Sequence, residues 1–496
     1  MELKLKSIIA GRGAAVAGST ALTPAVRWAV ASLSLSMLLS SLGTSIANVG
    51  LPTLAQAFNA SFQQVQWVVL AYLLAITALI VSVGRLGDIT GRRRLLLAGL
   101  SLFTVASLLC GVAPTLWLLI AARAVQGLGA AVMLALTMAF VAETVPKAKT
   151  GSAMGLLGTM SAVGTALGPT LGGLLISGLG WRAIFLVNVP LGALTLFLAH
   201  RYLPADRRGP KTVGAGFDPV GTVLLALTLA AYALAMTMGR GSFGVLNVAL
   251  LSVAVVGAGL FVLAEARAKS PLIRLAMFRN PMLSAGFAMS TLVTTVVMAT
   301  LVVGPFYLTG ALGLASAHVG LVMSSGPIVA ALTGVPAGHI VDRFGAHHVT
   351  IAGLIGMAAG SSILPMMPAS LSIPGYIAPL IVVTAGFALF QAANNTAVMT
   401  DIRADQRGVV SGLLNLSRNL GLITGASVMG TVFALGAASS SLMTARPEAV
   451  AAGMKVTFAV AAVLVIAALA IALVGQALSW RAVMASREQA DGRGMP

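Results

Sequence analysis

The chain has 496 residues, of which 58% are hydrophobic and only 8% are charged. A soluble protein of this length needs about a quarter of its residues charged to cover its surface, so the composition excludes a water-soluble fold and indicates a membrane protein. The net charge of +18 does not indicate nucleic-acid binding, because the basic residues lie in short loops between apolar runs, without interleaved aromatic residues.

Long apolar runs divide the chain. A membrane-spanning helix needs about 20 mainly apolar residues, and the sequence contains fourteen runs of that kind. In chain order they are 28–49, 66–86, 94–113, 116–140, 152–177, 183–203, 219–238, 245–264, 283–308, 319–340, 349–368, 375–397, 409–435 and 455–478. The segment Met1–Arg27 lacks an apolar core followed by a cleavage site, so we expect a retained tail and not a signal peptide.

The loops between these runs alternate in charge. Of the 30 Lys and Arg residues, only four lie in loops on one side of the predicted membrane, and two more, Arg123 and Arg418, lie inside spans. The four are Arg182, Arg240, Arg446 and Lys455. Because Lys and Arg collect on the cytoplasmic side of spanning helices, the alternation supports fourteen spans and predicts that both termini are cytoplasmic.

A short turn between the second and third runs recurs later in the chain. The stretch Gly84–Arg94 holds a Gly-x-x-x-Asp pattern and ends in three consecutive arginines. The stretch Gly338–Arg343 repeats Gly-x-x-x-Asp with an arginine directly after it, about half the chain length further on. Two bundles that carry the same turn are typical of the internal repeats of secondary transporters.

These observations predict an all-α, polytopic membrane protein. The predicted organisation is a cytoplasmic tail (1–27), a six-helix bundle (28–204), a linker with two extra transmembrane helices (205–281), a second six-helix bundle (282–478) related to the first by a pseudo-two-fold repeat, and a cytoplasmic tail (479–496). No loop has room for a soluble catalytic domain and no G-x-x-x-x-G-K-[ST] motif occurs. We therefore expect neither an enzyme nor an ATP-driven pump.

Several motifs, in order and at consistent depths in the predicted spans, resemble those of one family. They are Asn48–Pro52, Trp67–Tyr72, Gly84–Arg94, Arg123–Gly129, Gly164–Gly173, Trp181–Pro190 and Asn415–Gly421. Together they resemble the major facilitator superfamily, in particular its fourteen-helix drug:proton antiporter family, over nearly the whole chain. The resemblance implies two bundles that expose a central site alternately to the two sides of the membrane.

The repeated turn resembles the superfamily's signature between helices 2 and 3. The cytoplasmic gating residues that we predict from it are Gly84, Asp88, Gly91, Arg92, Gly338, Asp342 and Arg343. An acid at a helix end can face the positive N-terminus of another helix, here near residue 409, and hold the two bundles together. The alternative is that Asp88 is a solvated loop charge. Ile89 stands where the family pattern has an arginine, so the charge network is smaller than usual.

Two arginines lie inside predicted spans. Arg123 and Arg418 lie about eight and ten residues into their runs, at a depth of roughly 12 Å or more. An intramembrane arginine is costly and marks a functional site by default, so both are candidates for substrate binding or coupling, together with Glu143. The alternative is a structural role, in which Arg123 caps backbone carbonyls and Arg418 bonds to Asn415 and Asn419.

Amides are the other polar groups at membrane depth. The candidate cavity residues are Asn48, Gln391, Asn394, Asn395 and Asn415. Gln391, Asn394 and Asn395 share one face of a helix because they are three and four residues apart. A polar face of a spanning helix must point into the bundle or into a wet cavity. Hydrogen bonding between packed helices is the alternative.

The run Gly164–Gly173 resembles the antiporter motif of the family's fifth helix. Its candidate residues are Gly164, Gly168, Pro169, Gly172 and Gly173. Glycines spaced by four present a smooth face for tight helix packing, and the proline bends the helix. The resemblance implies that the bend seals the outer half of the interface between the bundles, and packing alone is the alternative.

No acidic residue lies at mid-depth in any predicted span. The family commonly has an Asp where this chain has Gly43, so the usual proton carrier and partner of cationic drugs is missing. Glu143 and Asp401, at predicted cytoplasmic helix ends, are the nearest substitutes, and solvated end charges are the alternative. Because Arg123 and Arg418 are then the charges at mid-depth, we expect a preference for neutral or anionic amphiphiles. We also expect Gly43→Asp to shift the preference toward cations.

The sequence therefore predicts a secondary active transporter that exports small organic or drug-like compounds, with proton-coupled antiport, from the bacterial plasma (inner) membrane. An uncoupled facilitator and a non-transporting sensor or scaffold on the same fold are the alternatives. The expected partners are a small-molecule substrate, protons and the lipid bilayer, without nucleic acid, cofactor or metal. Whether a periplasmic adaptor takes part is left open.

Overall fold

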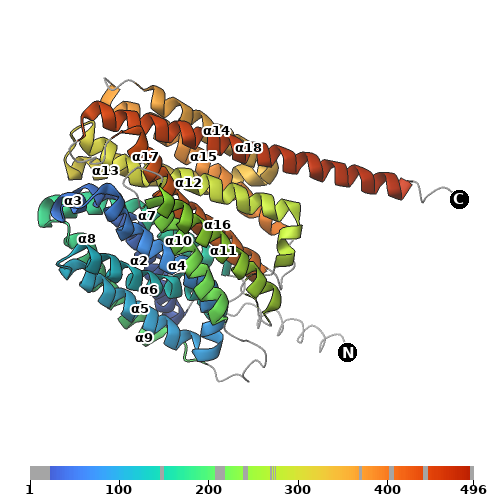
Figure 1. Cartoon of the computed structure of the whole chain (residues 1–496). Coiled ribbons are helices and arrows are strands. Elements are labelled where there is room, and N and C mark those ends of the chain that lie inside the picture. Colours follow the sequence, from blue (N-terminus) through green and yellow to red (C-terminus); the bar gives the residue numbers. More distant parts are fainter. Residues whose placement is uncertain are drawn as a thin grey trace, which may run out of the picture.

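The structure is a computed structural model that describes residues 23–145, 150–206, 218–237, 244–268, 271, 273, 275–367, 371–400, 407–438 and 445–491. Its elements are helices (Figure 1). They are α2 (Pro24–Val49), α3 (Leu51–Ala57), α4 (Phe62–Thr90), α5 (Arg92–Val112), α6 (Leu116–Thr144), α7 (Thr150–Leu179), α8 (Ala183–Leu186), α9 (Asn188–Tyr202), α10 (Pro219–Thr237), α11 (Val245–Arg267), η2 (Leu275–Arg279), α12 (Pro281–Gly310), α13 (Ser316–Phe344), α14 (Ala346–Ile363), η3 (Leu364–Met366), α15 (Ser372–Thr400), α16 (Arg407–Thr424), η5 (Gly425–Met429), α17 (Gly430–Gly436) and α18 (Pro447–Asp491).

Within the described residues, fourteen helical segments are long and apolar enough to span a membrane. This number and the helical content confirm the predicted all-α, fourteen-span class. Local capping explains where several spans begin. Thr23 accepts a hydrogen bond in the first turn of α2, Ser61 and Gln64 form a capping box on α4, and Asn280 caps α12 directly before Pro281.

Two helical bundles lie side by side (Figure 1). In the first, α2 packs against α7 and α9, and α6 packs against α4 and α5. In the second, α15 packs against α13 and α14, and α12 packs against α16 and α18. The bundles meet along two seams, one between α7 and α13 and one between α4 and α16.

The repeated turn has the same backbone form in both bundles. Gly91 separates α4 from α5 at φ 99°, and Gly345 separates α13 from α14 at φ 81°. A side chain would be strained at such a positive φ, which glycine adopts freely. The sequence repeat therefore corresponds to a structural repeat, in which each bundle turns sharply between its second and third spans.

Some predicted spans are not single regular helices. The run 183–203 is divided into α8 and α9, and Pro190 lies in the first turn of α9, where a proline is tolerated. The run 409–435 contains the π-helical segment η5 between α16 and α17. The last helix does not end at the predicted boundary, because α18 continues from the final span to Asp491 and projects beyond the bundles (Figure 1).

The two extra helices form a hairpin on the outside of the seam between α4 and α16. Helix α10 packs against α4 and also against η5, while α11 packs against α10. Most of the large apolar side chains of α11 are exposed, among them Val245, Val255 and Val256. A helix that is apolar and exposed in this way faces lipid in a membrane protein.

Candidate functional site

The two ends of the bundles differ in charge. One end, which we call the basic end, holds the turn Arg92–Arg94 and the repeated turn at Arg343. The other end, which we call the opposite end, holds Arg182, the start of α4 and the start of α13. The candidate residues fall into a turn at the basic end, one polar cluster in each bundle, and a closed seam at the opposite end.

The turn at the basic end is held by an acid that follows the sixth span. Asp206 accepts hydrogen bonds from the backbone nitrogens of Arg93 and Arg94, at 2.7 and 3.2 Å. The Arg93 side chain donates to the His200 carbonyl oxygen at 2.5 Å. Helix α5 has no side-chain cap from its own Gly91, so Asp206 satisfies the free N–H groups of its first turn and places a negative charge there.

Sequence reasoning missed the contact of Asp206 with this turn, although an acid shortly after the sixth span, on the same predicted side of the membrane as the three arginines, was a usable signal. Gly91 and Arg92 lie at the turn as predicted. In the second copy, Gly338 is half-buried, and Asp342 and Arg343 are exposed. The side chains of Asp88 and Glu143 lie outside the described side chains, and Asp401 lies outside the described residues. The role of Asp88 in holding the two bundles together and the coupling role of Glu143 therefore stay predictions.

Arg123 is enclosed in the first bundle. Its side chain is 0% exposed and donates to the Val68 carbonyl oxygen at 2.8 Å and to Gln126 at 2.6 Å. Gln126 in turn donates to Ser107 at 2.7 Å. The guanidinium lies 4.1 Å from the ring centroid of Tyr72. These contacts join α4, α5 and α6, so Arg123 has the environment expected for the structural alternative, in which it bonds to backbone and polar groups between helices.

Gly43 also faces the inside of the first bundle. A Cβ atom at this position would lie 3.0 Å from the Tyr72 hydroxyl and 3.3 Å from the Phe103 ring. Tyr72 donates to the Ser40 carbonyl oxygen at 2.9 Å. A side chain introduced at position 43 would therefore enter the cluster around Arg123.

Arg418 has a different environment from Arg123. It is half-buried on α16, and its Nη2 donates to the Asn395 side chain of α15 at 2.6 Å. Asn415 and Asn419, which lie three residues before it and one residue after it, are also half-buried. The second bundle therefore presents a partly accessible polar cluster at the level of Arg418.

The remaining amides divide into two kinds. Asn48 is buried and donates to the Thr44 carbonyl oxygen of its own helix at 3.1 Å. Asn394 is buried and joins α15 to α12 through the Gly286 carbonyl oxygen at 3.2 Å. Gln391 is half-buried. The first two have the contacts of packing residues, whereas Gln391 lies one helical turn from Asn395, on the same face.

The glycines of α7 are used on two faces. Added Cβ atoms at Gly164, Gly168 and Gly172 would collide with α2, against Leu38, Ser45 and Val49 respectively. Gly173 faces the other bundle instead, where its Cβ would lie 2.6 Å from the Ser316 carbonyl oxygen. The motif therefore packs α7 tightly against α2 within the bundle and against α13 across the seam.

The α7–α13 seam is closed at the opposite end. The Pro169 carbonyl oxygen lies against Gly320, so a side chain at Gly320 would collide with it. One turn deeper, the hydroxyls of Thr170 and Ser324 are hydrogen-bonded across the seam. The proline therefore lies where the two bundles pack closely, and its role in sealing the interface stays a prediction.

At the same end, aromatic rings close the contact of α4 with α12 and with α17, the helix that follows α16 and η5. The ring of Phe62 lies 4.6 Å from Phe306 and 5.8 Å from Phe433, centroid to centroid. Gln66, one turn further along α4, donates to the Ala426 carbonyl oxygen of η5 at 2.9 Å. The π-helical segment thus lies where the first bundle contacts the second, and such segments are frequent at functional sites.

Helix α10 is hydrogen-bonded to the first bundle near both of its ends. Thr222 and Ser82 of α4 are 2.7 Å apart, oxygen to oxygen. Trp67 of α4 donates to Thr237 at 3.0 Å. With these two hydrogen bonds, α10 is fixed along the length of α4.

Helix α10 is also hydrogen-bonded to the second bundle, but toward the opposite end. Tyr232 donates to Thr424 at 3.2 Å, and Thr431 donates to the Met236 carbonyl oxygen at 2.5 Å. These two hydrogen bonds flank η5 on either side. The extra helix is therefore part of the closed seam.

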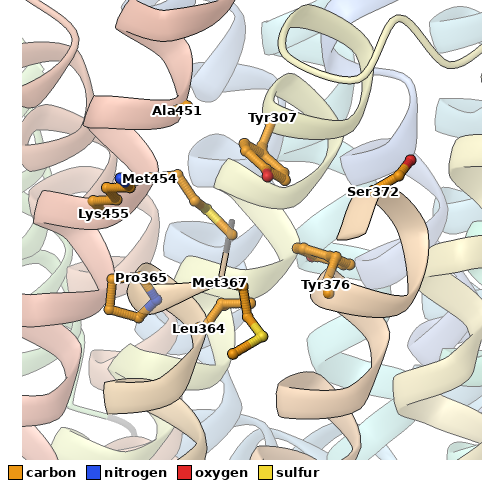
Figure 2. Close-up of a pocket in the computed structure, with 10 residues that line it drawn as sticks. Tyr307, Leu364, Pro365, Met367, Ser372, Tyr376, Ala451, Met454 and Lys455 are labelled. Atoms are coloured by element: carbon orange, nitrogen blue, oxygen red, sulfur yellow. The ribbon is translucent and has the colours of Figure 1, made fainter. Parts of the chain in front are cut away.

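One small cavity lies inside the second bundle, at the opposite end (Figure 2). It measures about 80 Å³ and lies between Tyr307, Tyr376, Met454 and Leu364, with the two tyrosine rings stacked at 5.9 Å. Pockets for drug-sized ligands measure about 300–1,000 Å³, so this cavity is too small for such a substrate.

Fourteen apolar spans in two bundles, a repeated basic turn and a seam closed at one end define a membrane transporter of the two-bundle type. The chain matches the family model "Major Facilitator Superfamily" over residues 33–426 and belongs to that superfamily. The family assignment confirms the resemblance seen in the motifs, and it places the chain in a family of transporters.

Curated relatives match over most of their length. The chain is 34% identical over 386 residues to "Uncharacterized transporter YebQ" of Escherichia coli, which covers 78% of this chain and 84% of that protein. It is 34% identical over 394 residues to "Multidrug resistance protein Stp" of Mycobacterium tuberculosis, covering 78% and 72%. It is 29% identical over 418 residues to "Multidrug efflux pump LfrA" of Mycolicibacterium smegmatis, covering 84% and 82%.

Solved structures show the same fold at low sequence identity. A bacterial homologue of the human lysosomal transporter Spinster, crystallised in an inward-facing and occupied conformation, has a TM-score of 0.67 and 14% identity and covers 92% of this chain and 98% of that one. The xylose transporter XylE of Escherichia coli has a TM-score of 0.61 and 13% identity, covering 89% and 97%. These likenesses concern the fold alone.

Proposed function

We propose that this transporter exports small organic or drug-like compounds by alternating access. The names of the relatives Stp and LfrA support the substrate class. The observation that carries the mechanism is the closed seam. Gly173 packs against Gly320 and Phe62 against Phe306 at the opposite end, while the polar cluster at Arg418, nearer the basic end, stays partly accessible.

In this proposal the basic end faces the cytoplasm of a bacterial inner membrane. The charge bias of the loops supports the orientation. Reporter fusions after residue 240 and after residue 446 should read external, and a fusion after residue 496 should read internal. An external reading at the C-terminus would contradict the orientation.

The transport cycle follows from the asymmetry between the ends. Substrate would reach the accessible cluster from the cytoplasm while the opposite end is sealed. Rocking of the bundles would then separate the glycine contact and the aromatic contact and release the substrate outside. Asp88 and the repeated turn at Asp342 and Arg343 would hold the basic end closed during that half of the cycle.

Proton-coupled antiport is part of the proposal, and the resemblance to drug:proton antiporters supports it. Glu143 is the acid that we propose as the proton carrier, because it lies in the last turn of α6, directly after the membrane-spanning segment Leu116–Val141, at the end that we propose to be cytoplasmic. Glu143→Gln should then transport without responding to a pH gradient.

Flux in proteoliposomes tests the proposal and its alternatives together. Purified protein should transport a drug-like substrate, and an imposed pH gradient should accelerate that transport. A transport rate that is the same with and without the pH gradient would identify an uncoupled facilitator. Protein that binds such compounds but moves none of them would identify a sensor or scaffold on the same fold.

A further inference from the structure

We infer that Arg418 binds the acidic group of the substrate, and that the transporter therefore prefers amphiphiles that carry a carboxylate or a comparable anionic group on an apolar body. This inference rests on the proposed export function and deepens it, because it assigns the substrate's charge to one residue.

Arg418 lies on a face of α16 that is not used for packing inside its bundle. Thr291 of α12 donates to the Ser417 carbonyl oxygen at 3.0 Å, and a side chain at Gly421 would collide with Thr291. Ser417 and Gly421 therefore mark the packed face. Asn415 and Asn419, four residues apart, lie on a different face beside Arg418, and all three are half-buried.

A polar stripe of this kind requires water or a polar ligand beside it. In a spanning helix, amides and a guanidinium that keep accessible surface cannot face hydrocarbon, because their N–H groups would be left unsatisfied. Helix α16 packs against α4 of the first bundle and against α12 and α15 of its own. The accessible stripe therefore faces the interior between the bundles.

The guanidinium keeps donors for a ligand. An arginine has five N–H donors in a planar fork, and within the described residues the Arg418 side chain makes one hydrogen bond, to Asn395. That hydrogen bond orients the fork. Gln391 lies on the same face of α15, one turn away, and is half-buried. A carboxylate fits this arrangement because it can accept two parallel N–H bonds from a guanidinium.

Arg123 does not offer the same site. It is 0% exposed, its Nε and Nη1 donate to Val68 and Gln126, and the rings of Tyr72 and Phe185 cover it at 4.1 and 5.8 Å. Its Nη2 has no hydrogen-bond partner among the described residues, but the whole side chain is enclosed by protein. The sequence assigned the preference for anions to both arginines, whereas the structure makes only one of them accessible. Anion recognition therefore depends on Arg418.

The first bundle carries half-buried apolar positions on α2 and α6, among them Leu35, Leu38, Leu134 and Ala135. The acidic side chains that the structure describes do not compete for Arg418, because they lie at helix ends or in the segment between α9 and α10; they are Asp206, Asp218, Glu265, Asp342 and Glu448. A site with apolar side chains from one bundle and a cation from the other suits an acidic amphiphile.

Three probes with one apolar body test the inference: 1-pyrenebutyrate, its methyl ester, and pyrenebutyl-trimethylammonium. Flux of each is measured in proteoliposomes that contain full-length protein. Wild type should transport the acid faster than the ester and the ester faster than the cation. Arg418→Gln should lower acid transport about tenfold or more and leave ester transport within about twofold of wild type, which also shows that the variant is folded.

Two further variants separate charge from geometry. Arg418→Lys keeps the charge but loses the fork, so it should transport the acid at a rate between wild type and Arg418→Gln. Lys455→Gln removes an equal charge from the rim of the small cavity at the opposite end and should not change the order of the three probes. An Arg418→Gln protein that keeps the wild-type preference for the acid would overturn the inference while leaving export intact. A wild-type protein that transports none of the three would instead count against the export function itself.

Discussion

Gly173 of α7 and Gly320 of α13 lie so close across the bundle seam that neither has room for a side chain. A Cβ atom on either glycine would lie 3.0 Å from the Cα atom of the other. Two backbones approach each other directly at this point, which only glycine permits. Because the two helices belong to different bundles, we expect the contact to separate when the opposite end opens.

Valine at position 173 should therefore prevent the closed seam from forming. We expect Gly173→Val to lower export about tenfold or more and to make Ser324→Cys, one turn below the contact, reactive to a thiol reagent added from the opposite side. Gly178→Val is the matched control on the same helix, since nothing lies within 4 Å of its added Cβ. Equal transport by the two valine variants would show that the glycine contact is dispensable.

Asp206 should contribute measurably to stability. Loss of a side-chain cap at a helix N-terminus costs about 0.5–2 kcal/mol, and Asp206 accepts from two backbone N–H groups of α5. We expect Asp206→Ala to lower the thermal unfolding midpoint and Asp206→Asn to give an intermediate value. Glu448→Ala, which removes an exposed acid from the first turn of α18, is the control. An Asp206→Ala midpoint no lower than that of the control would show that the cap is unimportant.

The geometry around Gly43 changes the expectation for an acid at that position. From the sequence, Gly43→Asp should shift the preference toward cations. In the structure the new carboxylate would lie beside Tyr72, in the cluster that encloses Arg123, and it would pair there without reaching the interior between the bundles. We therefore expect the variant to transport pyrenebutyl-trimethylammonium no better than wild type. A gain of about tenfold in cation transport would contradict this expectation and support the one made from the sequence.

Helix α10 should move with the first bundle. A short, cleavable thiol cross-linker between Met236→Cys and Thr431→Cys would tie α10 to the second bundle at a point that opening must separate. Transport should stop after cross-linking and return after cleavage, in a background in which Cys110 is replaced by Ala. The matched pair Ser82→Cys and Thr222→Cys joins α10 to α4, so its cross-link should leave transport unchanged. Full transport with the first pair cross-linked would show that α10 does not have to separate from the second bundle during transport.

The number of spans and the packing role of the α7 glycines could be predicted from the sequence, because hydropathy and glycine spacing are local properties. The exposure of Arg123 and Arg418 could not. The residues that enclose Arg123 include Val68, Tyr72 and Phe185, which belong to other spans. Both arginines occupy similar depths in apolar runs, so only the tertiary structure separates them.

The irregular segment η5 is a second feature that the sequence did not indicate. Its π-helical backbone coincides with the hydrogen bond from Gln66 to the Ala426 carbonyl oxygen, across the bundles. A long-range partner of this kind leaves no periodic pattern in the sequence. Asp206 was predictable in principle, but from the sequence we considered only Asp88 and the helix N-terminus near residue 409 for this turn, and not the end of the sixth span.

The most direct test of alternating access is the side from which the polar stripe can be reached. Asn419→Cys, in a background in which Cys110 is replaced by Ala, is treated with a membrane-impermeant thiol reagent in inside-out vesicles and in right-side-out vesicles. With the opposite end closed, the cysteine should react in inside-out vesicles, where the basic end is exposed, and react at least about tenfold more slowly in right-side-out vesicles. Faster reaction in right-side-out vesicles would contradict both the closed seam and the cytoplasmic orientation of the basic end.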